Sequence, residues 1–340
     1  MGREYTVAVV GATGLVGQTM CSVLEQRRFP VGRIKLLASA RSADTVVRWR
    51  GRDVVVEETK DGSFEGVDLV LISTGTDVSR RFSPVAVKAG AVVVDNSAAF
   101  RLEDWVPLVV PEVNPDDTAQ HKGIIANPNC STIQMVVALN PIHKVNPIKR
   151  IVVDTYQSVS GTGKEAVDEL RRQVELYAQG RAEEIKPKTY PHQIAFSLFP
   201  HIDVWMEDGS CREEWKMIRE TKKIMHLPDV KMAATTVRVP VFFAHSEAVH
   251  VELTEPMTPT QARDVLGKAP GVVVQDDTAS NQYPMPLSAA GRDEVFVGRI
   301  RTNEVFENGL SMWVVADNIR KGAATNAVQI AEVLVERGLL

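Results

Sequence analysis

A glycine-rich turn near the beginning of this 340-residue chain limits its possible folds more than any other feature. Gly11, Gly14 and Gly17 stand between an apolar run at 6–10 and a helical pattern at 17–26. Glycines at such a turn allow the backbone to bend sharply and to approach a pyrophosphate, which binds at the helix N-terminus. Because the spacing is G-x-x-G-x-x-G rather than G-x-G-x-x-G, the turn taken alone also fits a Rossmann-like unit that binds no dinucleotide.

The apolar runs along the chain predict two kinds of sheet. In the first 130 residues the runs are continuous, which is typical of buried parallel strands; they occupy 6–10, 34–38, 67–72, 91–95 and 107–110. From about residue 151 apolar and polar residues alternate, as in half-exposed antiparallel strands. Helical patterns occupy 164–179, 212–225 and 321–340. We therefore expect an α/β chain, with a Rossmann-like parallel-sheet domain and an α+β domain whose sheet is largely antiparallel.

Charge and cysteine content argue against several classes of protein. The net charge of −4 gives no sign of a nucleic-acid partner, and no apolar run approaches the roughly 20 residues of a membrane span. Cys21, Cys130 and Cys211 are too few and too scattered for a disulfide framework or a zinc site. We expect a cytoplasmic protein with reduced thiols, no bound metal and no membrane partner.

The end of the second predicted strand bears on the choice of dinucleotide. An NAD site usually carries Asp or Glu about 20 residues after the glycines, where it binds the ribose 2′-hydroxyl. Here Ser39, Arg41 and Ser42 occupy this region, and their hydroxyls and positive charge suit the 2′-phosphate of NADP. Asp44 lies close enough to leave NAD as the alternative, although the stretch favours NADP.

Cys130 has unusual neighbours for a structural cysteine. It follows an Asn-Pro-Asn corner at 127–129 and precedes Ser131, one of the small polar residues that are common at helix starts. A thiol at a helix N-terminus is favoured as the thiolate by free backbone N–H groups and the helix dipole. Cys130 is therefore a candidate nucleophile, with a buried structural cysteine as the alternative.

Polar residues gather in three further stretches. Gln157 lies on an alternating strand that runs into a Ser-Gly-Thr-Gly turn, and taken alone it fits a solvated strand face. Glu213 and Lys216 share one helical face at i, i+3, where surface ion pairs are common. Arg238 interrupts an apolar strand and needs an anionic partner, and His245, in an expected turn, belongs to the residue type that titrates near neutral pH.

Together with the dinucleotide turn, these groups fit the oxidation of an aldehyde through a thioester. A thiolate adds to the aldehyde, a base takes the hydroxyl proton, and hydride leaves for the nicotinamide. A second nucleophile then releases the acyl group from sulfur. Arg101, which follows the predicted strand at 91–95, and Lys216 are cations that suit a phosphate nucleophile, so the product would be an acyl phosphate.

The series of motifs resembles aspartate-semialdehyde dehydrogenase of the bacterial type. The motifs, in order over nearly the whole chain, are GATGLVG, ASARS, DNSAAFR, VVPEVN, NPNCSTIQ, YQSVSGTG, EEWKM, RVPVFFAHSE, YPMP, VGRIR and VADNIRKGAA. The resemblance implies NADP-dependent, phosphate-requiring interconversion of L-aspartate 4-semialdehyde and L-4-aspartyl phosphate by a homodimer. This step serves the biosynthesis of lysine, methionine, threonine and diaminopimelate. The implied domains are 1–129 for NADP, completed by a C-terminal helix at 318–340, and 130–317 for catalysis and dimerisation.

The resemblance also implies roles for individual residues. Cys130 would be the nucleophile, His245 the acid/base and Gln157 the residue that orients the substrate. Arg238 would bind the substrate α-carboxylate, whose two oxygens match the guanidinium fork, and Glu213 the substrate amino group. Phosphate would bind Arg101, Lys216 and Asn129. The NADP contacts would come from Gly11, Thr13, Gly14, Leu15, Val16, Gly17, Ser39, Arg41, Ser42, Ser160, Gly161 and Asn318.

Three positions depart from the pattern of that family. Ala244 stands where a glycine usually precedes the histidine, Asp44 stands where a glycine is common, and 73–79 replaces an Ala-Gly-Gly stretch.

Two alternative functions stay open beside the dehydrogenase. One is N-acetyl-glutamyl-phosphate reductase, whose acetylated substrate offers no cation to Glu213. The other is a non-catalytic NADP-binding regulator, which would have no use for the full set of reactive groups.

Overall fold

The computed structural model describes residues 3–340, which divide into two compact units. The first unit comprises the chain up to Asn129 together with Ala323–Leu340, and the second comprises Cys130–Gly322. The C-terminal segment therefore packs with the N-terminal part of the chain. Within residues 3–340, no helix combines the length and the apolar character that crossing a membrane requires.

The first unit is built on a seven-stranded sheet with the order β3-β4-β2-β1-β5-β6-β7. Its strands are β1 (Tyr5–Val10), β2 (Val31–Ala38), β3 (Val46–Trp49), β4 (Arg52–Glu58), β5 (Leu69–Ile72), β6 (Val92–Asp95) and β7 (Ile124–Ala126). The β3–β4 pair is antiparallel and the other neighbouring pairs are parallel. The continuous apolar runs correctly predicted this Rossmann-like sheet.

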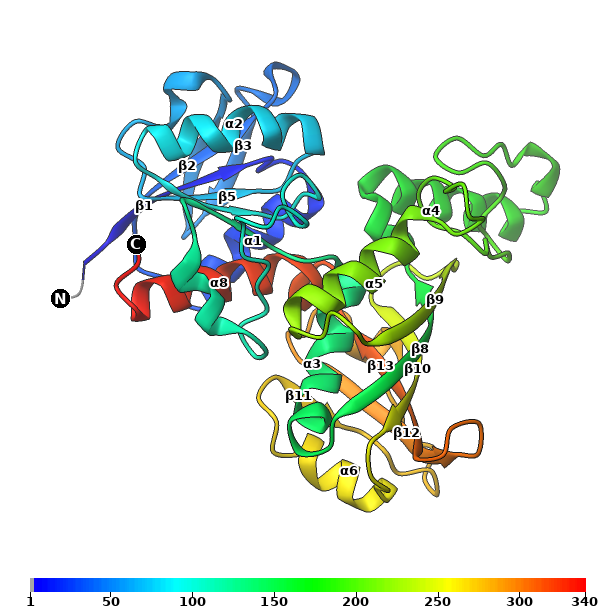
Figure 1. Ribbon diagram of the computed structural model, residues 1–340. Helices are drawn as coiled ribbons and strands as arrows, with labels where there is room; N and C mark the ends of the chain where they lie inside the picture. The colour runs from blue at the N-terminus through cyan, green and yellow to red at the C-terminus, as the bar shows by residue number, and fades with distance from the viewer. Residues whose placement is uncertain (1–2) are drawn as a thin grey trace. The chain divides into compact units, whose positions relative to one another are not determined.

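Helices cover both faces of this sheet (Figure 1). On one face lie α1 (Leu15–Gln26) and α8 (Thr325–Glu336), which pack on each other, and on the other lies α2 (Thr76–Lys88). Met20 and Leu24 of α1 and Ile330 of α8 are completely buried in the core between helices and sheet. Three short 3-10 turns, η1 (Ala40–Ser42), η2 (Asp61–Phe64) and η3 (Pro115–Gln120), complete the unit.

Two sequence predictions need correction in this unit. The run at 107–110 is not a strand, and within it Leu108 forms an isolated bridge to Ala126. Pro107 begins the run and Pro111 follows it, and proline lacks the backbone N–H that a ladder of hydrogen bonds needs. The C-terminal helix begins later than predicted, because a π-helical turn, η6 (Arg320–Ala324), precedes α8.

The second unit is built on a six-stranded sheet with the order β11-β12-β13-β10-β8-β9. Its strands are β8 (Ile148–Gln157), β9 (Lys231–Arg238), β10 (His245–Leu253), β11 (Val272–Val274), β12 (Val295–Asn303) and β13 (Gly309–Ala316). The β8–β9 and β11–β12 pairs are parallel and the other pairs are antiparallel. The alternating patterns correctly predicted a largely antiparallel sheet here.

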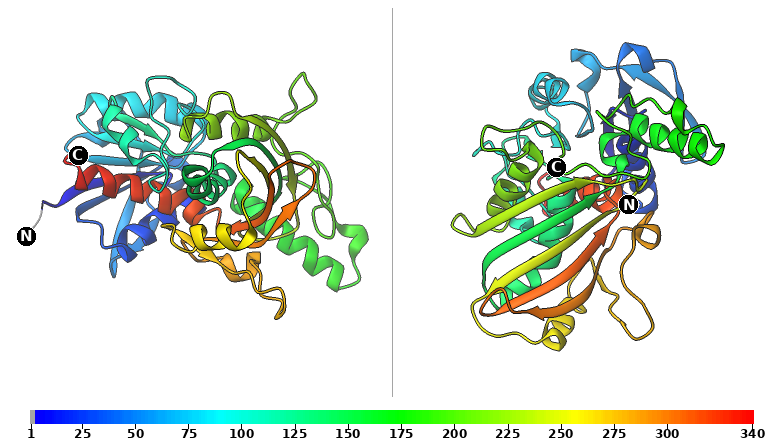
Figure 2. Two further views of the ribbon diagram at one scale, coloured as in Figure 1. Left: turned by 60° about the horizontal axis from the view of Figure 1, so that its bottom comes forward. Right: turned by 90° about the vertical axis from the view of Figure 1, so that its right-hand side faces the viewer.

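The helices α3 (Cys130–Val145), α5 (Arg212–Ile224) and α6 (Pro259–Leu266) gather on one face of this sheet (Figure 2). The opposite face carries aromatic side chains such as Tyr156 and Trp313, whose ring centroids lie 5.4 Å apart. The remaining elements are α4 (Lys164–Ala178), α7 (Pro286–Ala289), η4 (Val159–Thr162) and η5 (Ala182–Glu184). Gln157 and Arg238 are buried, and Gln157 faces α5, because its amide bonds to Glu213 of that helix.

Candidate active site

Cys130 is the first residue of α3, as the sequence predicted, and its side chain is partly exposed. The first backbone N–H groups of a helix have no intrahelical partner, so this position favours an anionic sulfur. Gly322 packs against it: a Cβ added at Gly322 would lie 2.9 Å from the Cβ of Cys130. A side chain at 322 would therefore push directly on the candidate nucleophile.

Strand pairing brings Gln157, Arg238 and His245 to one end of the sheet. The parallel pairing of β8 with β9 places Gln157 opposite Arg238, and both side chains are buried. His245 was predicted in a turn, but it is the first residue of β10, which pairs with β8 on its other side. Gln134, one turn into α3 from Cys130, donates from Nε2 to the backbone oxygen of His245 at 3.4 Å.

His245 is held as a neutral ring with a defined tautomer. The backbone N–H of Ser158 donates to His245 Nδ1 at 3.0 Å, so the hydrogen of the neutral ring lies on Nε2. Complete burial, with the charge of Arg238 as the second cause, lowers the pKa of His245 well below its usual value. Nε2 has no hydrogen-bond partner among the residues that the structure describes. His245 therefore offers a hydrogen-bond donor to a ligand.

Gly161 lies against the side chains of both Arg238 and His245. A Cβ added at Gly161 would lie 3.1 Å from Arg238 Nη1 and 3.3 Å from His245 Nε2. Arg238 Nη1 also donates to the carbonyl oxygen of Ser158 at 2.6 Å, which fixes the guanidinium near the imidazole. A cationic fork and a neutral N–H donor thus lie close to one small backbone segment.

Asn318 ties together the segments around His245. Its Oδ1 accepts hydrogen bonds from the backbone N–H of Ala244 at 3.0 Å and from the hydroxyls of Ser158 and Ser160 at 3.0 and 3.2 Å. Ala244 has a φ of +69°, a left-handed conformation that favours glycine. A glycine, which the resemblance leads us to expect here, would adopt this conformation without strain, and the hydrogen bond from the Ala244 N–H helps to hold the alanine in it.

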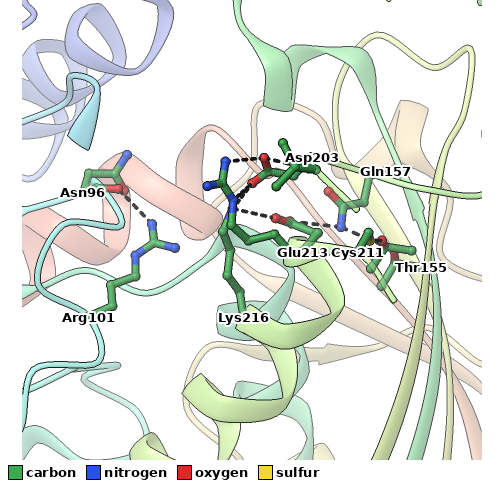
Figure 3. Close-up of polar contacts among 11 residues, drawn as sticks. Asn96, Arg101, Thr155, Gln157, Asp203, Cys211, Glu213 and Lys216 are labelled. Atoms are coloured by element: carbon green, nitrogen blue, oxygen red, sulfur yellow. Dashed lines mark hydrogen bonds and ion pairs between the residues drawn. The ribbon is translucent and has the colours of Figure 1, made fainter. Parts of the chain in front are cut away.

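A chain of hydrogen bonds runs from β8 to α5 and the preceding loop (Figure 3). Gln157 Nε2 donates to Thr155 Oγ1 and to Glu213 Oε1, both at 3.3 Å. Lys216 Nζ donates to Glu213 Oε2 at 3.1 Å and to Asp203 Oδ2 at 2.8 Å. Since a carboxylate only accepts hydrogen bonds, Glu213 fixes the orientation of the Gln157 amide, and Gln157 Oε1 is the atom left for an approaching donor.

The glycine-rich turn of the first unit fits a dinucleotide. Gly11 has a φ of +83°, and a Cβ there would lie 2.2 Å from the backbone oxygen of Ser73; a Cβ on Gly17 would lie 2.1 Å from that of Gly11. These close approaches set the N-terminus of α1, which Gly14 caps, beside the carboxyl ends of β1 and β5. Arg41 is exposed after the neighbouring β2, at the same edge of the sheet.

The predicted phosphate-binding residues come from both units. Arg101 and Asn129 belong to the first unit, and Lys216 belongs to the second. Within the first unit, Arg101 Nη2 donates to the backbone oxygen of Asn96 at 2.9 Å (Figure 3). Phosphate binding by these three residues stays a prediction.

Sequence reasoning missed Ser158, Asp203 and Gly322. A glycine in a helical run at the end of the chain was a detectable signal of close packing at Gly322. Ser158 acts through its backbone N–H and carbonyl oxygen as well as its hydroxyl, and no residue type reveals the backbone contacts. Asp203 lies in an irregular loop that also holds Glu207 and Asp208, so no periodic pattern distinguishes it.

Comparison with known proteins decides the family. The family model "Semialdehyde dehydrogenase, NAD binding domain" matches residues 6–121, and "Semialdehyde dehydrogenase, dimerisation domain" matches residues 139–321. The aspartate-semialdehyde dehydrogenase of Aquifex aeolicus is 56% identical over 339 residues, 99% of each chain. This chain belongs to the aspartate-semialdehyde dehydrogenase family. It is thus an NAD(P)-dependent oxidoreductase of amino-acid biosynthesis that acts on an aldehyde.

Further members of the aspartate-semialdehyde dehydrogenase family agree over the full length. The Bacillus subtilis enzyme is 50% identical over 348 residues and 100% of both chains. The crystal structure of aspartate semialdehyde dehydrogenase II from Vibrio cholerae, complexed with ASA, has a TM-score of 0.95 at 46% identity and covers 98% of this chain and 99% of its own. The enzyme from Candida albicans, solved with NADP, has a TM-score of 0.76 at 25% identity, over 99% and 100%.

Proposed function

We propose that this family member is an NADP-dependent, phosphate-requiring enzyme that interconverts L-aspartate 4-semialdehyde and L-4-aspartyl phosphate through a thioester on Cys130. The observation that carries the proposal is the packing of α3 on its sheet. Cys130 opens this helix, and Gln134 in its next turn bonds to His245. The complex of the Vibrio cholerae relative with ASA supports this substrate. The reaction would serve the synthesis of lysine, methionine, threonine and diaminopimelate.

The neutral tautomer of His245 suits the first half of the reaction. The Cys130 thiolate adds to the aldehyde carbon, and the carbonyl oxygen becomes an oxyanion. His245 Nε2–H donates a hydrogen bond to this oxygen, in a site where burial strengthens such a bond. NADP, when bound, would supply the hydride acceptor that oxidation of the adduct to the thioester requires. This sequence needs no proton transfer to His245, so a neutral imidazole is sufficient.

Recognition of the substrate is divided between three buried side chains. Arg238 binds the α-carboxylate with its fork, and Glu213 binds the substrate ammonium. Gln157 presents Oε1 to the reacting end of the substrate, since its two amide hydrogens are used within the protein. Phosphate, held by Lys216, Arg101 and Asn129, then attacks the thioester carbon and releases Cys130 as the thiolate.

The first unit supports NADP as the cofactor. Arg41, Ser39 and Ser42 offer a cation and two hydroxyls for the 2′-phosphate, and the exposed position of Arg41 leaves its guanidinium accessible. The Candida albicans relative was solved with NADP, which supports the same choice. Ser160, Gly161 and Asn318 would contact the nicotinamide end. The match to a dimerisation domain supports a homodimer.

The assay follows reduced nicotinamide by absorbance in purified protein with L-aspartate semialdehyde and NADP, with and without phosphate. We expect phosphate-dependent reduction, and a loss of at least about a thousandfold in Cys130→Ala because the nucleophile is removed. Cys21→Ala is the matched control, since burial raises the pKa of the Cys21 thiol to about 12 and keeps it unreactive. Reduction that proceeds equally without phosphate, or in Cys130→Ala, would refute the proposal.

A further inference from the structure

The carboxylate of Asp203 joins the two cations on the first turns of α5. Asp203 Oδ2 accepts from Lys216 Nζ and from Arg212 Nε, both at 2.8 Å, while Oδ1 accepts from Arg212 Nη2. Neither the sequence motifs nor the proposed reaction assigns Asp203 a role. We propose that Asp203 is a positioning residue, which holds Lys216 at the place where Lys216 binds phosphate. This inference rests on the proposed function.

Lys216 needs such an anchor because a lysine side chain is flexible. Its four-carbon stem has many rotamers and loses conformational entropy when it is ordered. Lys216 Nζ lies between two carboxylates, Glu213 Oε2 at 3.1 Å and Asp203 Oδ2 at 2.8 Å, and the side chain is 21% exposed. In the proposed complex Glu213 binds the substrate ammonium. Asp203 then keeps Lys216 in place when its bond to Glu213 weakens.

Asp203 is itself fixed before any ligand arrives. Its φ is +75°, a conformation that Asp and Asn tolerate better than most residues, and its Oδ1 accepts the backbone N–H of Val204 at 3.0 Å. Partial burial opposes its charge, but hydrogen bonds and charge from Arg212 and Lys216 outweigh burial and lower the pKa of Asp203 to about 2. The anchor is therefore ionised at neutral pH.

Arg212 explains why an acidic anchor does not repel phosphate. Its guanidinium binds both oxygens of Asp203, and this pair is charge-balanced. Asp203 can therefore accept a hydrogen bond from Lys216 while its negative charge is compensated from the other side. Glu213 differs in that it accepts hydrogen bonds from the Gln157 amide and from Lys216, and in the proposed complex it also pairs with the substrate ammonium.

The test is Asp203→Asn, which preserves the left-handed backbone and the size of the side chain. An amide has one acceptor oxygen, so it cannot bind the Arg212 fork and Lys216 together. We expect the KM for phosphate to rise about tenfold, the effect of one charge-assisted hydrogen bond. The KM values for aspartate semialdehyde and NADP should stay within about twofold, as for a change that touches neither ligand.

Asp208→Asn is the matched control, because Asp208 lies in the same loop but accepts from Ser210 and Trp215. Its phosphate KM should equal that of the wild type. Lys216→Ala tests the proposed function itself, which requires that its KM for phosphate rises. An unchanged phosphate KM in Lys216→Ala would contradict the proposed function, and so would reduction of NADP by the wild type that does not depend on phosphate. If both behave as proposed but Asp203→Asn leaves the phosphate KM unchanged or lowers it, the positioning inference alone is wrong. A parallel rise of all three KM values with a lower Tm would instead show a purely structural residue.

Discussion

The contact between Gly322 and Cys130 makes Gly322→Ala the most direct test of the candidate site. The new Cβ would lie 2.9 Å from the Cβ of Cys130, 3.3 Å from its Cα and 3.4 Å from its backbone oxygen. Carbon atoms pack without strain at about 3.5–4.0 Å. The shortest contact therefore requires the methyl group and Cys130 to separate by roughly 0.6–1.1 Å. The neighbours of this contact are backbone and Cβ atoms, which cannot rotate away.

Two effects on stability oppose each other, and their magnitudes decide the sign. Alanine is favoured over glycine within a helix by about 1 kcal/mol. Overpacking in a close-packed interior costs about 1–3 kcal/mol. We expect a net loss of about 1 kcal/mol in the free energy of unfolding. The effect on catalysis should be larger, because a reacting group that is misplaced by about 1 Å can lose about 100-fold. We therefore expect kcat/KM for aspartate semialdehyde to fall about 10- to 100-fold.

Three measurements separate a displaced nucleophile from an unfolded protein. They are kcat/KM from nicotinamide absorbance, the rate of Cys130 alkylation by iodoacetamide, and the Tm. Gly62→Ala is the matched control, because the nearest atom to its Cβ is Glu65 Oε1 at 3.9 Å. A Gly322→Ala variant with wild-type kcat/KM and a wild-type alkylation rate would refute the claim that this contact sets the position of the cysteine.

Three further substitutions probe the same unit. Glu247 is completely buried, and burial raises its pKa well above the usual range. The contribution of the neutral Glu247 to the free energy of unfolding is therefore fully present at low pH and is lost as pH rises through this pKa. Glu247→Gln should therefore gain in Tm over the wild type, and the gain should grow as pH rises above 4.5, the ordinary pKa of a Glu carboxyl; a constant difference would contradict this. Gly161→Ala should raise the KM for aspartate semialdehyde about tenfold in steady-state assays, because its methyl group would occupy space beside His245. Ala244→Gly removes about 1 kcal/mol of strain from the left-handed backbone of the folded state. The glycine also increases the conformational entropy of the unfolded chain, which stabilises the unfolded state by a similar amount. Chemical denaturation should therefore show a change below about 0.5 kcal/mol in the free energy of unfolding.

Much of the fold could be predicted from the sequence because local patterns determine it. Continuous apolar runs indicated the parallel sheet, and alternating runs indicated the sheet of the second unit. The helix at 212–225 corresponds to α5, whose bounds are Arg212–Ile224. The run at 107–110 failed as a strand because apolar character says nothing of the hydrogen bonds that prolines remove. The π-helical turn before α8 was missed because π-helical turns are rare and occur mostly as single turns within α-helices.

The residue types of the candidate site could be predicted from the sequence, but the burial and hydrogen bonds of those residues could be predicted less well. Cys130 at the start of a helix and the i, i+3 pair of Glu213 and Lys216 followed from spacing alone. The burial of Gln157 did not, since a polar residue on an alternating strand equally fits a solvated face. The tautomer of His245 depends on a backbone N–H, and the anchor of Lys216 depends on an irregular loop. The identities of the neighbouring residues indicate neither the tautomer of His245 nor the contact that holds Lys216.

The register of the strands in the second sheet places residues that are far apart in the sequence beside one another in the candidate site. Gln157 and Arg238 are neighbours only because β8 and β9 pair in parallel with Asp154 opposite Thr235 and every later pair in step. A slip of one residue would turn Arg238 to the opposite face, away from α3 and α5, since side chains alternate along a strand. The buried Gln157–Glu213 bond and the Arg238–Ser158 bond both depend on this register and would be lost with it. The same contacts that would bind the substrate therefore also specify the pairing of these strands, and a substitution in the site should disturb the fold of this edge as well as the chemistry.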